Sequence, residues 1–136
     1  LSADGQPVLV ARQMPAGVEV ILGAVRDERF GPIVMVGMGG LYAESFREVA
    51  FRGWPVGEED VEEMLGEGRL GKVLALERRG RPLDHPALSR LVVTLGRILD
   101  DHPQLEQIEL NPVIVYESGV CTVDAKLSLG NWGGPA

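Results

Sequence analysis

The chain has 136 residues, 45% of them hydrophobic, which is the size and balance of one folded domain and argues against intrinsic disorder. Its 20 acidic and 13 basic residues give a formal net charge of −7, which opposes nonspecific binding to nucleic acid or to an anionic membrane surface. No apolar run approaches the roughly 20 residues that span a bilayer, and no signal peptide is expected.

Because Cys121 is the single cysteine, no internal disulfide can form, and we expect a cytoplasmic protein. Since the chain begins with Leu1 rather than methionine, we expect it to be a piece of a longer protein.

The first half of the sequence predicts strands. Residues 7–14 and 18–26 are rich in valine and isoleucine, and a turn at 15–17 separates them. The short apolar run 33–36 is bounded by glycine and predicts a buried strand. Residues 46–52 alternate weakly between polar and apolar and predict a fourth strand.

Two helices are expected in the middle of the chain. Residues 58–65 open with three acidic residues, which suit a helix N-terminus because the helix dipole is positive there. The clearest element spans 88–99, where apolar residues recur with a period of 3.6. Asp84 is its expected N-cap, and Pro103 stops it.

The last part of the chain predicts a hairpin. Residues 107–111 and 120–127 alternate with a period of two, and 117–119 form a turn between them. The second strand is expected to turn its apolar set to the buried side, namely Cys121, Val123, Ala125 and Leu127. Residues 130–136 read as a linker or frayed end. Several strands and two helices without strict βαβ alternation predict an α+β domain.

The hairpin brings two candidate metal ligands together, Asn111 and Asp124, on the polar faces of its two strands. A four-residue loop would place them directly opposite each other. A two-residue loop would place Asn111 opposite Lys126 with Asp124 one diagonal step away, and a three-residue loop without a bulge would separate the pair onto opposite faces. An amide oxygen and a carboxylate suit Mg²⁺, which usually binds one or two protein groups together with substrate phosphates. The alternative is a solvated polar face.

Two further segments are candidates for holding phosphate groups. Gly37-Met38-Gly39-Gly40 follows a buried strand and precedes Glu44, and glycines let backbone amides approach a ligand closely. It is neither a P-loop nor a dinucleotide fingerprint, because the G-K-S/T ending and the G-x-G-x-x-G spacing are absent, and the alternative is a tight turn. The second segment is a basic cluster that binds phosphate or lies in a solvated loop: Arg78, Arg79 and Arg81.

Taken in order, these motifs resemble the ATP-grasp domain of NDP-forming acyl-CoA synthetases, a group that includes the ADP-forming acetyl-CoA synthetases and is related to the β subunit of succinyl-CoA synthetase. The resemblance covers nearly the whole chain and is carried by Gly17-Val18-Glu19-Val20-Ile21-Leu22-Gly23, Arg26-Asp27, Phe30-Gly31-Pro32, Gly37-Met38-Gly39-Gly40 with Glu44, Arg79-Gly80 with Asp84, Glu109-Leu110-Asn111-Pro112 and Val123-Asp124-Ala125-Lys126. It implies the C-terminal lobe of an ATP-grasp fold over residues 1–129, with a mostly antiparallel sheet and helices packed on one face. Residues 130–136 would be a linker or disordered tail.

The resemblance also implies roles. Asn111 and Asp124 would bind the Mg²⁺ that accompanies ATP or another nucleoside triphosphate such as GTP. The residues implied to bind the nucleotide are Glu19, Gly39, Gly40 and Glu44. The implied reaction is reversible phosphoryl transfer between ATP and a phosphoenzyme, coupled to formation of an acyl-CoA thioester.

The resemblance covers only one of the two lobes that clamp ATP in this family. The upstream H-K-x-D-x-G-G-V type segment, whose lysine contacts ATP, is not among these residues. The isolated chain is therefore expected to be inactive and to need the remaining domains or subunit of a synthetase, and its uncovered surface favours a homodimer. Two alternatives stay open. One is a non-catalytic, synthetase-like regulatory domain of a GNAT-type acetyltransferase, and the other is a structural α+β interaction domain without a nucleotide site.

Overall fold

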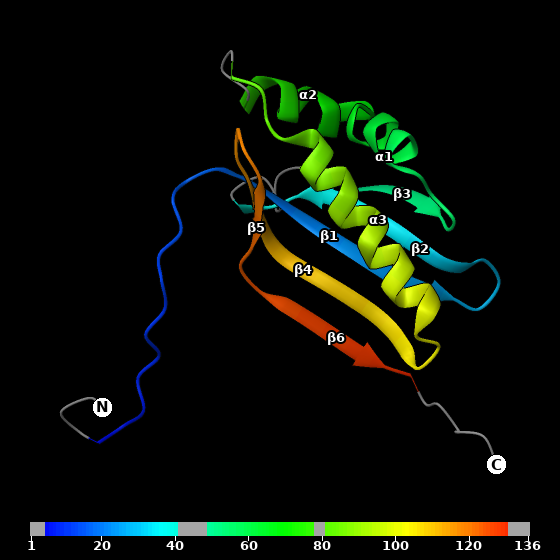
Figure 1. The fold of residues 1–136 in the computed structure, drawn as a ribbon, viewed down its shortest axis with the longest axis horizontal. Coiled ribbons are helices and arrows are strands. Elements are labelled where there is room, and N and C mark those ends of the chain that lie inside the picture. The colour runs from blue at the N-terminus through cyan, green and yellow to red at the C-terminus, as the bar shows by residue number, and fades with distance from the viewer. Residues whose placement is uncertain (1–4, 41–48, 78–80, 131–136) are drawn as a thin grey trace.

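The structure, a computed structural model, describes residues 5–40, 49–77 and 81–130. Within these residues, three helices lie on one face of a single six-stranded sheet (Figure 1). The strands are β1 (Val18–Asp27), β2 (Gly31–Met38), β3 (Val49–Gly53), β4 (Leu105–Val115), β5 (Val120–Thr122) and β6 (Ala125–Leu129), and the helices are α1 (Glu58–Leu65), α2 (Gly68–Glu77) and α3 (His85–Asp101). The order is β3-β2-β1-β4-β5, β6 also pairs with β4, and every pair is antiparallel. The predicted α+β class with a mostly antiparallel sheet is confirmed.

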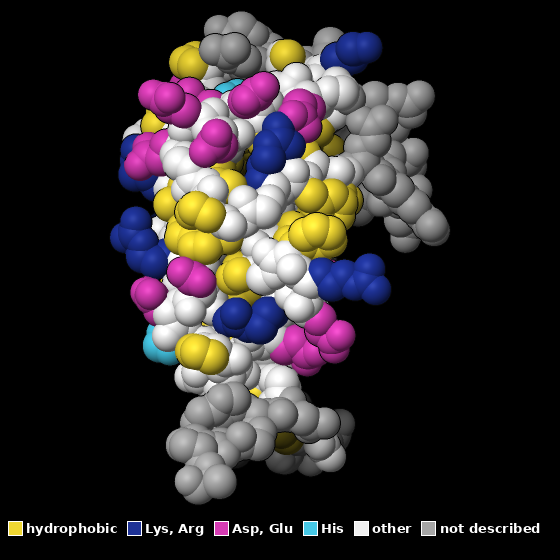
Figure 2. Space-filling model, turned by 90° about the vertical axis from the view of Figure 1, so that its right-hand side faces the viewer, with side chains coloured by type: hydrophobic (Ala, Val, Ile, Leu, Met, Phe, Trp, Pro, Cys, Tyr) yellow, Lys and Arg dark blue, Asp and Glu magenta, His cyan; other side chains and the backbone are white. Residues whose placement is uncertain are grey.

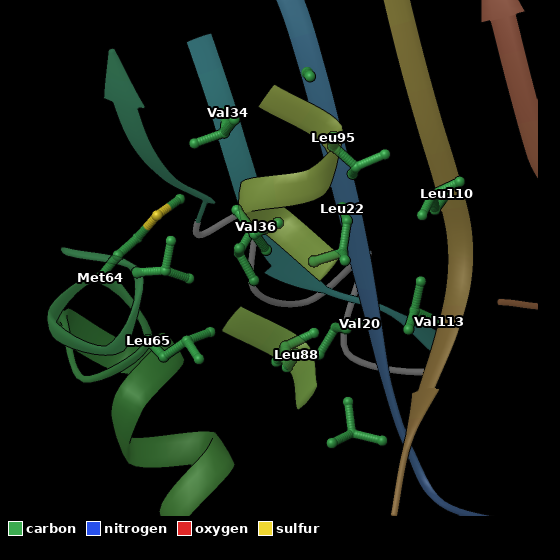
Figure 3. Close-up of a cluster of buried hydrophobic side chains, with 14 of the residues drawn as sticks. Val20, Leu22, Val34, Val36, Met64, Leu65, Leu88, Leu95, Leu110 and Val113 are labelled. Carbon is green, nitrogen blue, oxygen red and sulfur yellow. The ribbon is translucent and has the colours of Figure 1, made fainter. Parts of the chain in front are cut away.

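The hydrophobic core lies between the sheet and the helices. Alternate residues of β1 point into it, as do those of β2 and β4, and they meet side chains of α1 and α3 (Figure 3). The most fully buried include Val20, Leu22, Val34, Val36, Met64, Leu65, Leu88 and Val113. Because side chains alternate along a strand, the residues between the buried ones point to the other side of the sheet. We call this side the helix-free face.

Side-chain hydrogen bonds hold helix α3 at both ends. At its start, the Asp84 carboxylate accepts a hydrogen bond from the Ala87 amide at 3.0 Å, which satisfies one of the free donors of the first turn. At its other end, the Arg26 guanidinium of β1 donates to three backbone carbonyls, those of Leu99, His102 and Leu105. The apolar stripe predicted from the 3.6-residue period faces the core as expected.

The structure contradicts the expected strand at 7–14. These residues carry no regular secondary structure, and Leu9 is 94% exposed, because no strand of the described ranges pairs with them. The predicted strand at 46–52 is found as β3 over 49–53, and its first three residues lie outside the described ranges. Residues 131–136 of the expected linker also lie outside them.

Helix α2 was not anticipated from the sequence. Gly66 and Gly68 indicate the end of the helix predicted at 58–65, and α1 does end before Gly66. A Cβ atom at Gly71 would lie 2.3 Å from the Gly66 carbonyl oxygen, so the absence of a side chain lets α2 approach the end of α1. The glycines here allow close packing as well as a turn.

The exposed side of α1 is strongly acidic. Asp60 at the third helical position accepts a hydrogen bond from the Gly57 amide at 2.7 Å, which caps the helix start. The other acids of this helix, Glu58, Glu59, Glu62 and Glu63, are exposed. Figure 2 shows acidic side chains gathered over the upper part of the molecule, the end that holds α1. No helix among the described residues is long and apolar enough to cross a bilayer.

Candidate functional site

The β4–β5 turn decides between the registers that the sequence left open. Val115 pairs with Val120, so four residues form the loop, and within it the Tyr116 amide donates to the Gly119 carbonyl at 3.1 Å. Further along, the Asn111 amide donates to the Asp124 carbonyl at 3.0 Å. The four-residue register is therefore the one adopted, and it sets Asn111 directly opposite Asp124.

Asn111 lies in a bulge of β4. Two residues, Asn111 and Pro112, stand opposite the single residue Ile21 of β1, so Leu110 and Val113 both face the core although they are three positions apart. Proline has no N–H to give to the ladder, which favours an irregularity at this point. The bulge leaves Asn111 exposed on the helix-free face, beside an otherwise regular strand.

The side chains of this pair have oxygen atoms available for a cation. The Asn111 Nδ2 donates to Glu109 Oε1 at 3.3 Å, so the amide carbonyl oxygen is left to accept a ligand. The Asp124 Oδ1 accepts the Ala125 amide at 2.9 Å, and a carboxylate has lone pairs beyond that one bond. Glu109 is thus a further residue of this cluster. Sequence alternation put it on the polar face but did not show that it orients Asn111.

The amide and carboxylate fit Mg²⁺ better than a metal that needs many protein ligands. Among the described residues, no group of three or more His, Cys, Asp or Glu side chains is arranged to hold a metal. Mg²⁺ keeps several waters and usually takes one or two protein groups together with substrate phosphates. Two protein oxygens are therefore a sufficient set for it.

The glycine-rich segment meets Glu19. The Gly39 amide donates to the Glu19 carbonyl at 2.9 Å, and a Cβ atom at Gly40 would lie 2.7 Å from the Glu19 Oε2. Gly40 has a φ of +61°, a conformation that other residues rarely adopt. The structure thus brings together three of the four residues expected near the nucleotide. The fourth, Glu44, lies outside the described residues.

This cluster shares a face of the sheet with the Asn111–Asp124 pair. Glu19 lies between the buried residues Val18 and Val20, so it points to the helix-free face. Its partner in the ladder is Ile114 of β4, three residues along the strand from Asn111. Lys126 of β6 lies opposite Glu109 of β4 in the ladder and adds a cation to this side. The candidate site therefore runs across β1 and β4 to the start of β6.

The structure corrects the expected apolar face of the second hairpin strand. Cys121 pairs with Ile114 and is only half-buried, whereas Ala125 pairs with Leu110 on the core side of the sheet. The alternation changes phase because 123–124 leave the strand conformation beside the bulge of β4. On β6, Leu127 is 59% exposed because no helix covers this edge of the sheet (Figure 1).

The basic cluster is described only at Arg81. Its guanidinium lies 3.0 Å from a Glu117 carboxylate oxygen, and both side chains are largely exposed. This ion pair links the segment before α3 to the β4–β5 turn. Arg78 and Arg79 lie outside the described residues.

Comparison with known proteins gives consistent matches. A family model described as ATP-grasp domain matches residues 2–129. The β subunit of acetate–CoA ligase (ADP-forming) I from Pyrococcus furiosus is 38% identical over 127 residues, which are 93% of this chain and 55% of that subunit. The 4-hydroxybutyrate–CoA ligase (ADP-forming) of Nitrosopumilus maritimus is 32% identical over 117 residues, 86% of this chain and 17% of that protein.

The solved structures agree with the sequence matches. The dinucleotide-forming acetyl-coenzyme A synthetase 1 of Ca. Korarchaeum cryptofilum, in complex with coenzyme A and Mg-AMPPCP, has a TM-score of 0.79 and 41% identity, over 86% of this chain and 55% of that one. The chain thus spans about half the length of the Pyrococcus subunit and of this solved structure. From the family match, the sequence identity and the shared fold, the chain belongs to the ATP-grasp domain family.

Proposed function

We propose that this chain is the nucleotide- and Mg²⁺-binding lobe of an ADP-forming acyl-CoA synthetase, with the lobe spanning residues 1–129 and a linker over 130–136. The observation that carries the proposal is the Asn111–Asp124 backbone hydrogen bond of 3.0 Å, because residues directly opposite each other in a ladder are close enough to share a ligand. Glu19, Gly39 and Gly40 support it from the neighbouring strands, since they meet on the helix-free face.

In this proposal each residue has a defined part. Asn111 and Asp124 hold Mg²⁺, and Glu109 keeps the Asn111 amide turned so that its oxygen faces the cation. Bound Mg²⁺ neutralises charge on the nucleotide phosphates, which is most of what phosphoryl transfer requires. The Gly39–Gly40 backbone and Glu44 line the phosphate side, and Glu19 adjoins them.

The proposed partners are ATP or another nucleoside triphosphate and the remaining domains or subunit of the synthetase. The Pyrococcus relative is itself a subunit, and the relatives named above are all CoA ligases. This favours the ligase over a regulatory domain of an acetyltransferase and over a structural module. Reversible transfer between ATP and a phosphoenzyme, coupled to acyl-CoA formation, is the proposed reaction of the complete protein.

Replacement of the acid tests the proposal. In the complete protein, Asp124→Ala should abolish Mg·ATP-dependent phosphorylation, because the cation loses its charged ligand, while circular dichroism and the melting temperature stay close to wild type. Asp101→Ala removes an exposed acid from the end of α3 and serves as the control, with activity unchanged. Wild-type phosphorylation by the Asp124 variant would show that the cation is held elsewhere.

A further inference from the structure

The segment that carries Asp124, from β5 to β6, has little to fix its register. β5 has only three residues, all five residues of β6 are exposed, and 123–124 between them are exposed as well. Register in a sheet is strongly specified where one face of a strand is buried, since a slip of one residue would expose the apolar set. That constraint is weak here, although a slip would separate Asn111 from Asp124.

Asp84 contacts both ends of the turn that sets this register. Its backbone amide donates to the Tyr116 carbonyl at 2.8 Å. Its carboxylate Oδ2 accepts the Gly119 amide at 2.6 Å, while Oδ1 accepts the Ala87 amide that starts α3. Tyr116 and Gly119 are the first and last residues of the four-residue loop. One residue therefore joins a well-buried helix to a turn in the least buried part of the sheet.

Two further features act on the same turn. The Arg81–Glu117 ion pair ties the preceding residues to it, although exposed pairs of this kind contribute little. Gly119 adopts a φ of +83°, and no heavy atom lies within 4 Å of the position that a Cβ atom would take there. Glycine is therefore favoured by the backbone conformation of the turn and not by a lack of room for a side chain. The hydrogen bond to Asp84 therefore holds the loop at the point where the chain reverses.

We propose that Asp84 is a positioning residue for the metal pair: by holding Tyr116 and Gly119, it fixes the hairpin in the four-residue register and so keeps Asn111 opposite Asp124. This inference rests on the proposed function for the role of the pair, but the register itself is independent of any ligand. A residue that only capped α3 would have no effect on the hairpin.

Asp84→Asn separates the two roles of this side chain. Asparagine is as good an N-cap as aspartate, so α3 keeps its start. While its oxygen caps α3, its NH2 group takes the place of Oδ2 and faces the Gly119 amide, and two donors cannot form a hydrogen bond. Val61→Ala is the matched control, because it removes buried volume from α1, a helix that packs mainly against α3 and β3 and not against the hairpin.

The first readout is hydrogen exchange in the complete protein without added nucleotide or metal. The Asn111 amide, protected in the wild type by its bond to Asp124, should exchange at least tenfold faster in Asp84→Asn, while the amides of Leu95 and Leu99 keep their protection. Unchanged protection at Asn111 would overturn the proposal and leave Asp84 as a helix cap only.

The second readout is the Mg²⁺ concentration that gives half-maximal phosphorylation. We expect about a tenfold increase in Asp84→Asn, with the maximal rate largely recovered at saturating Mg²⁺, because residues behind metal ligands typically alter affinity by 10- to 100-fold. Val61→Ala should leave this concentration unchanged. An unchanged value in Asp84→Asn, despite faster exchange at Asn111, would also overturn the proposal.

The two proposals fail in different ways. If Asp124→Ala retains activity, the metal assignment is wrong whatever happens at Asp84. If Asp124→Ala is inactive but Asp84→Asn behaves as wild type in both readouts, the metal assignment stands and the positioning role is wrong.

Discussion

At the scale of single residues, the contact between Gly40 and Glu19 shows how a missing side chain shapes the candidate site. Any Cβ at position 40 would meet the Glu19 carboxylate at 2.7 Å, in a backbone conformation that favours glycine. A methyl group there has two separate costs, one in backbone strain and one in displacement of the carboxylate. The backbone strain lowers the free energy of unfolding, and the displaced carboxylate changes which ligand the site can bind.

Gly40→Ala and Gly31→Ala together distinguish these costs. Gly31 also has a positive φ, of +73°, but no atom lies within 4 Å of its Cβ position. Both variants should lose about 1 kcal/mol of folding free energy in urea titrations, because alanine is strained in this region. Only Gly40→Ala should weaken binding of Mg·ATP to the complete protein, measured by calorimetry. Equal nucleotide affinities in the two variants would place Glu19 outside the nucleotide site.

At the scale of elements, the junction between α3 and the β4–β5 turn makes the stability of the fold depend on pH. The pKa of Asp84 is lowered from its ordinary value, first by the hydrogen bond from the Gly119 amide and then by that from Ala87, with smaller effects from Arg90 and His85. A depressed pKa means that the folded state favours the ionised carboxylate. The resulting stability is present above the unfolded pKa of about 3.9 and is lost as pH falls through the folded value.

The difference in unfolding free energy between wild type and Asp84→Asn should therefore shrink in acid. Near pH 7 the wild type should be the more stable, and the difference should begin to shrink below about pH 4 and go on shrinking as the folded carboxylate becomes protonated, because protonated aspartate loses the advantage of its charge. Urea titrations from pH 3 to pH 7 measure this. A difference that stays constant across that range would mean that the charge of Asp84 does not contribute.

The elements that could be predicted from the sequence are those whose signals are local. Helix α3 has its cap, its period and its stop within its own residues, and the alternation of 107–111 places Asn111 on the polar face without knowledge of the fold. The strand at 7–14 is wrong because a strand needs partners that the local sequence does not reveal. The helix at 68–77 was missed because its glycines, which permit close packing on α1, look like helix breakers.

At the scale of the whole molecule, the candidate pair was predictable but its surroundings were not. Three loop lengths were compatible with the same hairpin, and only the folded chain shows that Asp84 supports the four-residue one. The phase change at Pro112, which moves Cys121 to the helix-free face, depends on pairing with β1. These features come from contacts between segments far apart in sequence.

The uncovered edge of the sheet bears on self-association. Val123, Leu127 and Leu129 are each more than half exposed along this edge. Apolar surface of this kind favours association, so the 136-residue chain should show a mass that rises with concentration in sedimentation equilibrium. Leu127→Gln should reduce this rise, whereas Ser128→Gln, on the other side of the same strand, should not. A single monomer mass across the concentration range would exclude the homodimer.

The double attachment of α3 has one more consequence. With Arg26 holding one end and Asp84 the other, the helix can neither slide nor roll over β1 and β4 without breaking several hydrogen bonds at once. We therefore expect the spacing of Glu19, Asn111 and Asp124 to be preorganised before any ligand arrives. A rigid platform of this kind would lose little entropy on binding, and any closing motion would fall to parts of the protein outside it.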